Sequence, residues 1–76
     1  MAVETGLRGR QKRRRRADIT AAGRQLFVEQ GYDVTSMEVI AELAEVSVAT
    51  VYNYFGTKGR LLAAIMQIDV AALFEQ

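Results

Sequence analysis

Apolar residues recur every three or four positions in the first half of the chain. Between Ile19 and Phe27 they form one stripe of a helix, with small residues that do not interrupt it. Gly31 follows and is a typical helix terminator, because glycine adopts the left-handed backbone conformation at little cost. We therefore predict a first helix over residues 13–30. The Phe27 and Tyr32 rings are expected to touch across its end, as in a Schellman motif.

The second helix is predicted by the residues that start it. Thr35 and Glu38 have the spacing of a capping box, in which each side chain accepts a hydrogen bond from the other residue's backbone N–H. Val34 and Val39 flank this box as a hydrophobic staple. The expected core face of this helix consists of Met37, Ile40, Ala41 and Ala44.

Two further helices each follow a hydroxyl residue that can cap them. Ser47 precedes a short helix over residues 48–55, which Gly56 ends. Thr57 is expected to cap a fourth helix, and with this cap the helix occupies residues 57–76. The apolar stripe of this fourth helix consists of Leu61, Ala64, Ile65, Ile68, Ala72 and Leu73. No segment alternates with a period of two, so the predicted fold class is all-α.

The charge of the chain is divided unevenly. Its 10 Lys and Arg residues and 9 Asp and Glu residues give a net charge of +1. Residues 1–16 hold seven basic residues and one acid, net +6, whereas residues 17–76 hold three basic residues and eight acids, net −5. Residues 1–12 lack a periodic apolar pattern, so we predict a disordered basic arm that binds a polyanion. A solvated tail without a partner is the alternative.

Composition excludes several classes of site. The chain has no Cys and no His, which removes disulfides, thiolate sites, the commonest metal ligand and the commonest general base. We therefore predict no enzyme activity, no metal and no cofactor. No apolar run approaches the roughly 20 residues of a membrane span, and no apolar segment follows the basic N-terminus as in a secretory signal. The expected location is the cytoplasm.

The helices predicted over residues 37–44 and 48–55 are joined by three residues, which is the arrangement of a helix-turn-helix motif. No charged residue lies between Glu45 and Thr57, although 25% of the chain is charged. The exposed face expected for the second of these helices carries Ala49, Thr50, Asn53 and Tyr54. Small and hydrogen-bonding side chains of this kind are typical of contact with the major groove of DNA.

Lys58 and Arg60 lie in the first turn of the predicted fourth helix. Cations there oppose the helix macrodipole, at a cost of about 0.3–1 kcal/mol each. A phosphate docked at that helix terminus would explain them, and simple tolerance of exposed charge is the alternative. Among the seven basic residues within residues 1–16, Arg14 is a further candidate phosphate ligand.

The run from Ile19 to Ile65 resembles the N-terminal DNA-binding domain of the TetR family of transcription regulators. The stretches that carry the resemblance are AAGRQLFVEQGYDVTSMEVIAELA and VSVATVYNYFGTKGRLLAAI. The resemblance implies a three-helix, homeodomain-like domain over residues 13–56, followed by the start of a fourth helix. It also implies that the helix over residues 48–55 is the recognition helix.

The resemblance assigns candidate DNA contacts. The residues that match positions holding the DNA backbone are Thr35, Ser47, Tyr54 and Lys58. The residues that match positions facing bases or phosphates in the groove are Val48, Ala49, Thr50, Tyr52 and Asn53. The helical phase of Val48 places it in the core instead. Glu45 stands where the family usually has glycine, so a strained left-handed backbone is expected there.

For the whole protein, the resemblance implies a ligand-responsive repressor that binds palindromic operator DNA as a homodimer. We expect the small-molecule effector and the dimer interface to belong to a C-terminal domain beyond residue 76. A non-catalytic bundle whose uncharged helix binds a partner helix is the alternative class. Binding to a membrane surface is not expected, because residues 8–16 lack the apolar face that it needs.

Overall fold

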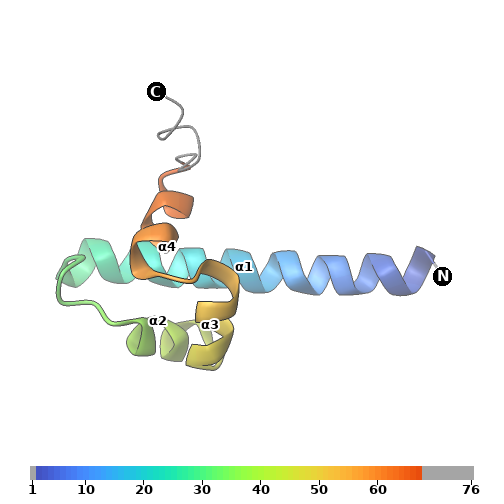
Figure 1. Cartoon of the computed structure of the whole chain (residues 1–76), viewed down its shortest axis with the longest axis horizontal. Coiled ribbons are helices and arrows are strands. Elements are labelled where there is room, and N and C mark those ends of the chain that lie inside the picture. The colour runs from blue at the N-terminus through green and yellow to red at the C-terminus, as the bar shows by residue number, and fades with distance from the viewer. Residues whose placement is uncertain (1, 68–76) are drawn as a thin grey trace.

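The computed structural model describes residues 2–67, which form four helices and no strand. The helices are α1 (Ala2–Gln30), α2 (Met37–Ala44), α3 (Val48–Phe55) and α4 (Lys58–Ile65). The three short helices gather about the C-terminal half of α1, and the N-terminal half of α1 projects beyond them (Figure 1). The predicted all-α fold is confirmed.

The centre of the core takes one residue from each helix. These residues are Ile19, Ile40, Val51 and Leu61, and each is fully buried. Gly23 allows α4 to approach α1 closely, because a Cβ atom there would lie only 3.1 Å from Leu61 Cδ2. Burial of one large aliphatic side chain contributes about 1.5–3 kcal/mol. This small cluster therefore fixes how the four helices lie relative to one another.

The start of α1 differs from the prediction. The structure begins the helix at Ala2, so the expectation of a disordered segment over residues 1–12 is wrong for residues 2–12. Gly6 and Gly9 each disfavour the helix by about 1 kcal/mol relative to alanine. Most of their neighbours are good helix formers, and extension of a helix that the body has already nucleated costs little. Residues 2–16, which carry the seven cations and are called the arm below, are consequently a helical extension of the body.

The end of α1 confirms a predicted contact and corrects its hydrogen bond. Gly31 has a positive φ of 97°, and the Phe27 and Tyr32 rings lie 5.0 Å apart between centroids. The Gly31 N–H donates to Phe27 O at 3.0 Å. This is the bond of the simpler αL ending, in which the residue after the cap bonds the carbonyl four residues back.

The start of α2 is shifted by one residue from the prediction. Ser36 is the N-cap, and its Oγ accepts a hydrogen bond from the Val39 N–H at 3.1 Å. Thr35 is only 1% exposed, and its hydroxyl donates to Gly31 O at 2.7 Å. Because Thr35 satisfies a carbonyl at the end of α1, the neighbouring serine takes over the cap. The expected capping box and staple are therefore wrong, and Val34 is 71% exposed.

The fourth helix begins as predicted and ends earlier. Thr57 Oγ1 accepts a hydrogen bond from the Arg60 N–H at 3.0 Å, which confirms the expected cap. The helix ends at Ile65, and Gln67 has a positive φ of 59°. The part of the predicted stripe that consists of Ile68, Ala72 and Leu73 lies outside the described residues.

Candidate nucleic-acid interface

The corner between α2 and α3 contains a left-handed residue, as the sequence predicted. Glu45 has φ 61° and ψ 42°. Val46 N–H donates to Ala41 O at 3.0 Å and Glu45 N–H donates to Glu42 O at 3.2 Å. These two bonds form a Schellman motif, whose left-handed position is usually glycine. The strained Glu45 is the bend that sets α3 across α2.

The first turn of α3 is closed by two hydroxyl groups. Ser47 is the N-cap, and its Oγ accepts a hydrogen bond from the Thr50 N–H at 3.1 Å. The Ser47 and Thr50 hydroxyls also lie 2.8 Å apart and hydrogen-bond each other. Ser47 is exposed and Thr50 is half-buried, and the two predicted contact residues lie side by side at the start of α3.

The two faces of α3 differ in exposure. Val51 and Phe55 are buried in the core. Ala49 and Asn53 are exposed, and Tyr52 is 46% exposed, so the structure brings these three predicted groove residues onto the outer face. Val48 is half-buried and packs against the core, which agrees with its helical phase. Residues 48–55 therefore form a helix with a fixed inner face and an uncharged outer face.

Lys58 has a structural role that sequence reasoning missed. Its Nζ donates to Tyr32 O at 2.8 Å and to Thr35 O at 3.0 Å, and it lies 4.3 Å from the centroid of the Tyr32 ring. The side chain thus ties the start of α4 to the loop between α1 and α2. This explains a cation in the first turn of a helix without any ligand. The ammonium still has a hydrogen to donate, since lysine carries more donors than these two bonds use.

Ser36 takes the position at the start of α2 that the sequence predicted for Thr35. The hydroxyl of Thr35 is buried and engaged with Gly31 O, so this side chain is not placed to meet an external phosphate. Ser36 is exposed at the start of α2, where free N–H groups lie. The signal that could have revealed this was the pair of adjacent hydroxyl residues, either of which can cap a helix.

The α1 cations that lie beside α3 do not include Arg14, which the sequence indicated as a candidate phosphate ligand. Lys12, Arg13 and Arg16 line a hollow together with Asn53 and Tyr54 of α3. Tyr54 is half-buried and packs against the core, whereas the sequence predicted it on the exposed face of this helix. Arg14 is exposed and is not among the lining residues. Residues two positions apart in a helix differ in direction by roughly 200° around its axis, so Arg14 and Lys12 point in nearly opposite directions.

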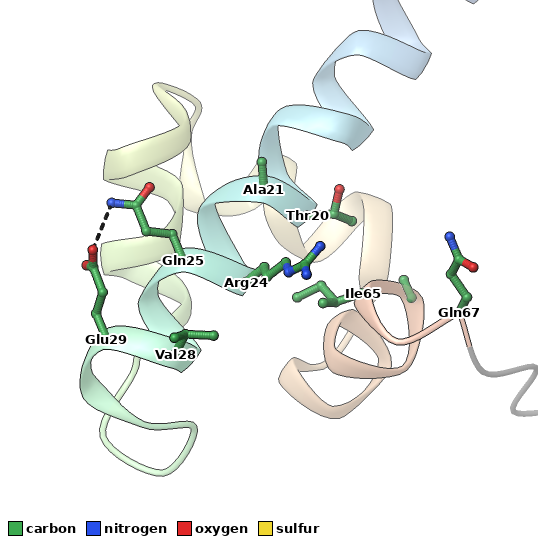
Figure 2. Close-up of a pocket in the computed structure, with 9 residues that line it drawn as sticks. Thr20, Ala21, Arg24, Gln25, Val28, Glu29, Ile65 and Gln67 are labelled. Carbon is green, nitrogen blue, oxygen red and sulfur yellow. Dashed lines mark hydrogen bonds between the residues drawn. The ribbon is translucent and has the colours of Figure 1, made fainter.

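A second hollow lies between α1 and α4, and α2 and α3 do not line it (Figure 2). Its volume is about 720 Å³. Figure 2 shows Arg24 and Val28 of α1 pointing toward Ile65 and Gln67. The Gln25 side-chain amide donates a hydrogen bond to the Glu29 carboxylate at 3.3 Å. Among the described residues, no group of three or more acidic side chains is placed to hold a metal ion.

No helix within residues 2–67 is long and apolar enough to cross a membrane. A helix-turn-helix with an uncharged outer face, flanked by the cations of α1, is thus the functional surface that stands out. A family model described as "Bacterial regulatory proteins, tetR family" matches residues 19–65, which is more than half of the chain. The chain belongs to the TetR family.

Curated relatives agree with this family assignment. The chain is 41% identical over 69 residues to the HTH-type transcriptional regulator TcmR of Streptomyces glaucescens, covering 90% of this chain and 30% of the relative. It is 36% identical over 56 residues to the HTH-type transcriptional activator FasR of Mycolicibacterium smegmatis, covering 74% of this chain and 26% of the relative. It is 32% identical over 73 residues to the HTH-type transcriptional repressor NicS of Pseudomonas putida, covering 96% of this chain and 34% of the relative. No solved structure shows a significant match.

The chain spans about a third or less of the length of these curated relatives. The part that it spans is the TetR-family helix-turn-helix DNA-binding domain of a transcription regulator, which confirms the resemblance seen in the sequence. The TetR family consists of regulators and not of enzymes, so the predicted absence of enzyme activity agrees with the family.

Proposed function

We propose that this protein binds a specific sequence of duplex DNA, with α3 lying in the major groove. The observation that carries the proposal is the exposed face of α3. Ala49, Tyr52 and Asn53 lie on this face, and the opposite face is anchored by the buried Val51 and Phe55. Base edges are read by hydrogen bonds and apolar contacts at fixed positions, and a rigidly supported, uncharged helix face provides both.

The outer side chains of α3 have different roles in this proposal. Asn53 is the candidate for direct base readout, because its amide can both donate to and accept from one base edge, most favourably adenine. Ala49 and Tyr52 offer apolar surface to thymine methyl groups. Val48 and Thr50 are half-buried and contribute at the margin of this surface.

Contacts with the DNA backbone come from the helix ends around this face. Ser36 and Ser47 are exposed N-caps of α2 and α3, where free N–H groups and the helix dipole favour an anion. Tyr54 supplies a hydroxyl, and Lys58 has a spare donor near the start of α2. Such contacts fix the orientation of the protein and carry no direct sequence information. The buried Thr35 has no direct contact in this proposal.

For the whole protein, we propose a homodimeric repressor of a palindromic operator that is released by a small-molecule effector and acts in the cytoplasm. Family membership supports this proposal, and so does the greater length of the relatives, which leaves room for a domain that holds the effector and the dimer interface. One relative is named a repressor and another an activator. The proposed repressor role predicts that deletion of the gene raises expression of an adjacent reporter. A fall in expression would show activation instead.

The DNA-binding proposal is tested by titrating labelled duplexes with the full chain at constant salt. One duplex is the DNA upstream of the protein's own gene, and the control is a random duplex of the same length. We expect tighter binding to the upstream DNA by at least about tenfold, because each correctly read base pair contributes about 1–3 kcal/mol. Equal affinity for both duplexes would contradict the proposal and favour a protein-interaction bundle, which has no sequence preference.

A further inference from the structure

A hollow of about 340 Å³ separates the N-terminal half of α1 from the last turn of α3. Its α1 wall consists of Lys12, Arg13 and Arg16, and its α3 wall consists of Asn53 and Tyr54. Three cationic side chains thus face two neutral hydrogen-bonding side chains. This combination is suited to an anion with several acceptor oxygens, and a phosphate group is the common biological example.

The direction of these cations follows from the period of the helix. Lys12, Arg16 and Ile19 follow one another at intervals of four and three residues, so they lie on one stripe of α1. Ile19 is fully buried against the other helices. The stripe that faces the core therefore continues, beyond the edge of the body, as a cationic stripe that faces α3.

Arg16 is held in place by α3. Its guanidinium carbon lies 4.8 Å from the centroid of the Phe55 ring, which is the geometry of a cation–π contact. Phe55 is buried, so its ring is a fixed support. Arg16 is consequently oriented before a ligand arrives, which reduces the entropy that its ordering would cost on binding.

Folding alone gives no reason to gather charge at this place. Lys12, Arg13 and Arg16 repel one another at short range. Asn53 and Tyr54 lie in the last turn of α3, where the helix macrodipole is negative and disfavours an anion. An anion in the hollow must therefore be held by the cations of α1.

We infer that this hollow binds one phosphate of the DNA backbone, on the strand that passes the end of α3. The inference rests on the proposed function and gives the cations of the arm unequal roles. Lys12 and Arg13 donate to the phosphate, and Tyr54 closes the site with its hydroxyl. Arg14 and Arg15 do not line the hollow and act on DNA only through long-range charge.

Two double variants of the full chain separate these roles. Lys12→Gln with Arg13→Gln removes two cations from the hollow, and Arg14→Gln with Arg15→Gln removes two cations outside it. Both variants lose the same charge, and glutamine has nearly the helix propensity of lysine and arginine. The measurement is the affinity of each for a random duplex across a series of salt concentrations, with the parent chain alongside.

The first variant should bind at least about tenfold more weakly than the second at low salt, because it loses charge-assisted hydrogen bonds. It should also lose about 0.9 more of the slope of log affinity against log salt, which corresponds to one phosphate. Equal losses in the two variants would overturn the inference and leave the proposed function standing. Failure of the parent chain to bind any duplex would overturn both.

A double-mutant cycle tests whether Tyr54 shares the phosphate with the cations. Tyr54→Phe should weaken binding severalfold in the parent chain and have little effect in the Lys12→Gln, Arg13→Gln variant. Such non-additivity is expected of side chains that contact the same phosphate group. Additive losses would show that Tyr54 acts elsewhere and would overturn the shared site.

Discussion

The two halves of α1 are ordered by different forces. In the half that lies in the body, Ile19, Ala22 and Gly23 are buried against the other helices. In the projecting half, every side chain from residue 10 to residue 16 is exposed. This half is helical through its own propensity and through continuation of a helix that the body has nucleated. The stability of the body and the geometry of the arm are therefore separable properties of one helix.

Positive charge also serves different purposes in the two regions. In the body, Lys58 is bonded to the carbonyls of Tyr32 and Thr35 and holds a loop. In the arm, Lys12 and Arg13 line one wall of a hollow whose other wall is α3. Lys58 thus stabilises the fold with two of its donors and has one left for a ligand, whereas the proposed role of Lys12 and Arg13 is ligand binding.

The largest expected effect breaks the body through its core. Leu61→Ala leaves a cavity at the point where α4 meets α1, so it should lower the free energy of unfolding by about 2–5 kcal/mol. The measurement is a urea titration followed by circular dichroism. Arg14→Ala in the arm is the control and should change the free energy by no more than about 0.5 kcal/mol. Similar losses in both variants would mean that the arm contributes to the core stability.

A smaller effect distinguishes a cation that is hydrogen-bonded within the body from an exposed one. Lys58→Met keeps the length of the side chain but removes the Nζ donor from the Thr35 carbonyl and one of two donors from the Tyr32 carbonyl, which should cost about 1.5–3 kcal/mol of unfolding free energy. Arg60→Met removes an exposed cation two residues away and should cost no more than about 0.5 kcal/mol. If both variants were equally stable, the bonds of Lys58 to Tyr32 and Thr35 would not stabilise the loop.

Backbone strain in the body gives a stabilising prediction. Glu45→Gly relieves a left-handed residue that costs roughly 1–2 kcal/mol, so the urea midpoint should rise. Glu42→Gly, inside α2, is the matched control and should lower the midpoint, because glycine disfavours a helix interior. A lowered midpoint in the Glu45 variant would show that the corner is not strained.

The smallest effect concerns the arm alone. Gly9→Ala should favour the helix of the arm by up to about 1 kcal/mol locally. The added Cβ would lie 3.4 Å from Arg13 Nη1, which is the end of a flexible side chain. Helix content should rise while the urea midpoint of the body stays the same. A shifted midpoint would show that arm and body unfold together.

Much of the fold could be predicted because its signals are local. Ser47 and Thr57 cap their helices as expected, since a hydroxyl residue before an apolar stripe meets its partner N–H three residues on. The left-handed Glu45 was predictable because its position usually requires glycine. The cap of α2 was assigned one residue early because Thr35 and Ser36 can both cap, and only the end of α1 decides between them.

The candidate site was less predictable because its contacts are not local. The bonds of Lys58 span 26 and 23 residues, so no local pattern reveals them. The choice among the arm cations depended on the helix starting at Ala2, because only a helix gives Lys12 and Arg14 different directions. Composition alone made the seven cations of the arm equivalent.

The most direct test of DNA recognition by α3 is the base preference of two variants. The measurement is the affinity of the parent chain, Asn53→Ala and the Lys12→Gln, Arg13→Gln variant for all single-base-pair changes in one bound sequence. Asn53→Ala should lose preference at one position by about 1–3 kcal/mol. The cation variant should bind every sequence more weakly with its preferences intact. Preferences altered by the cation variant and unchanged by Asn53→Ala would contradict the placement of α3 in the groove.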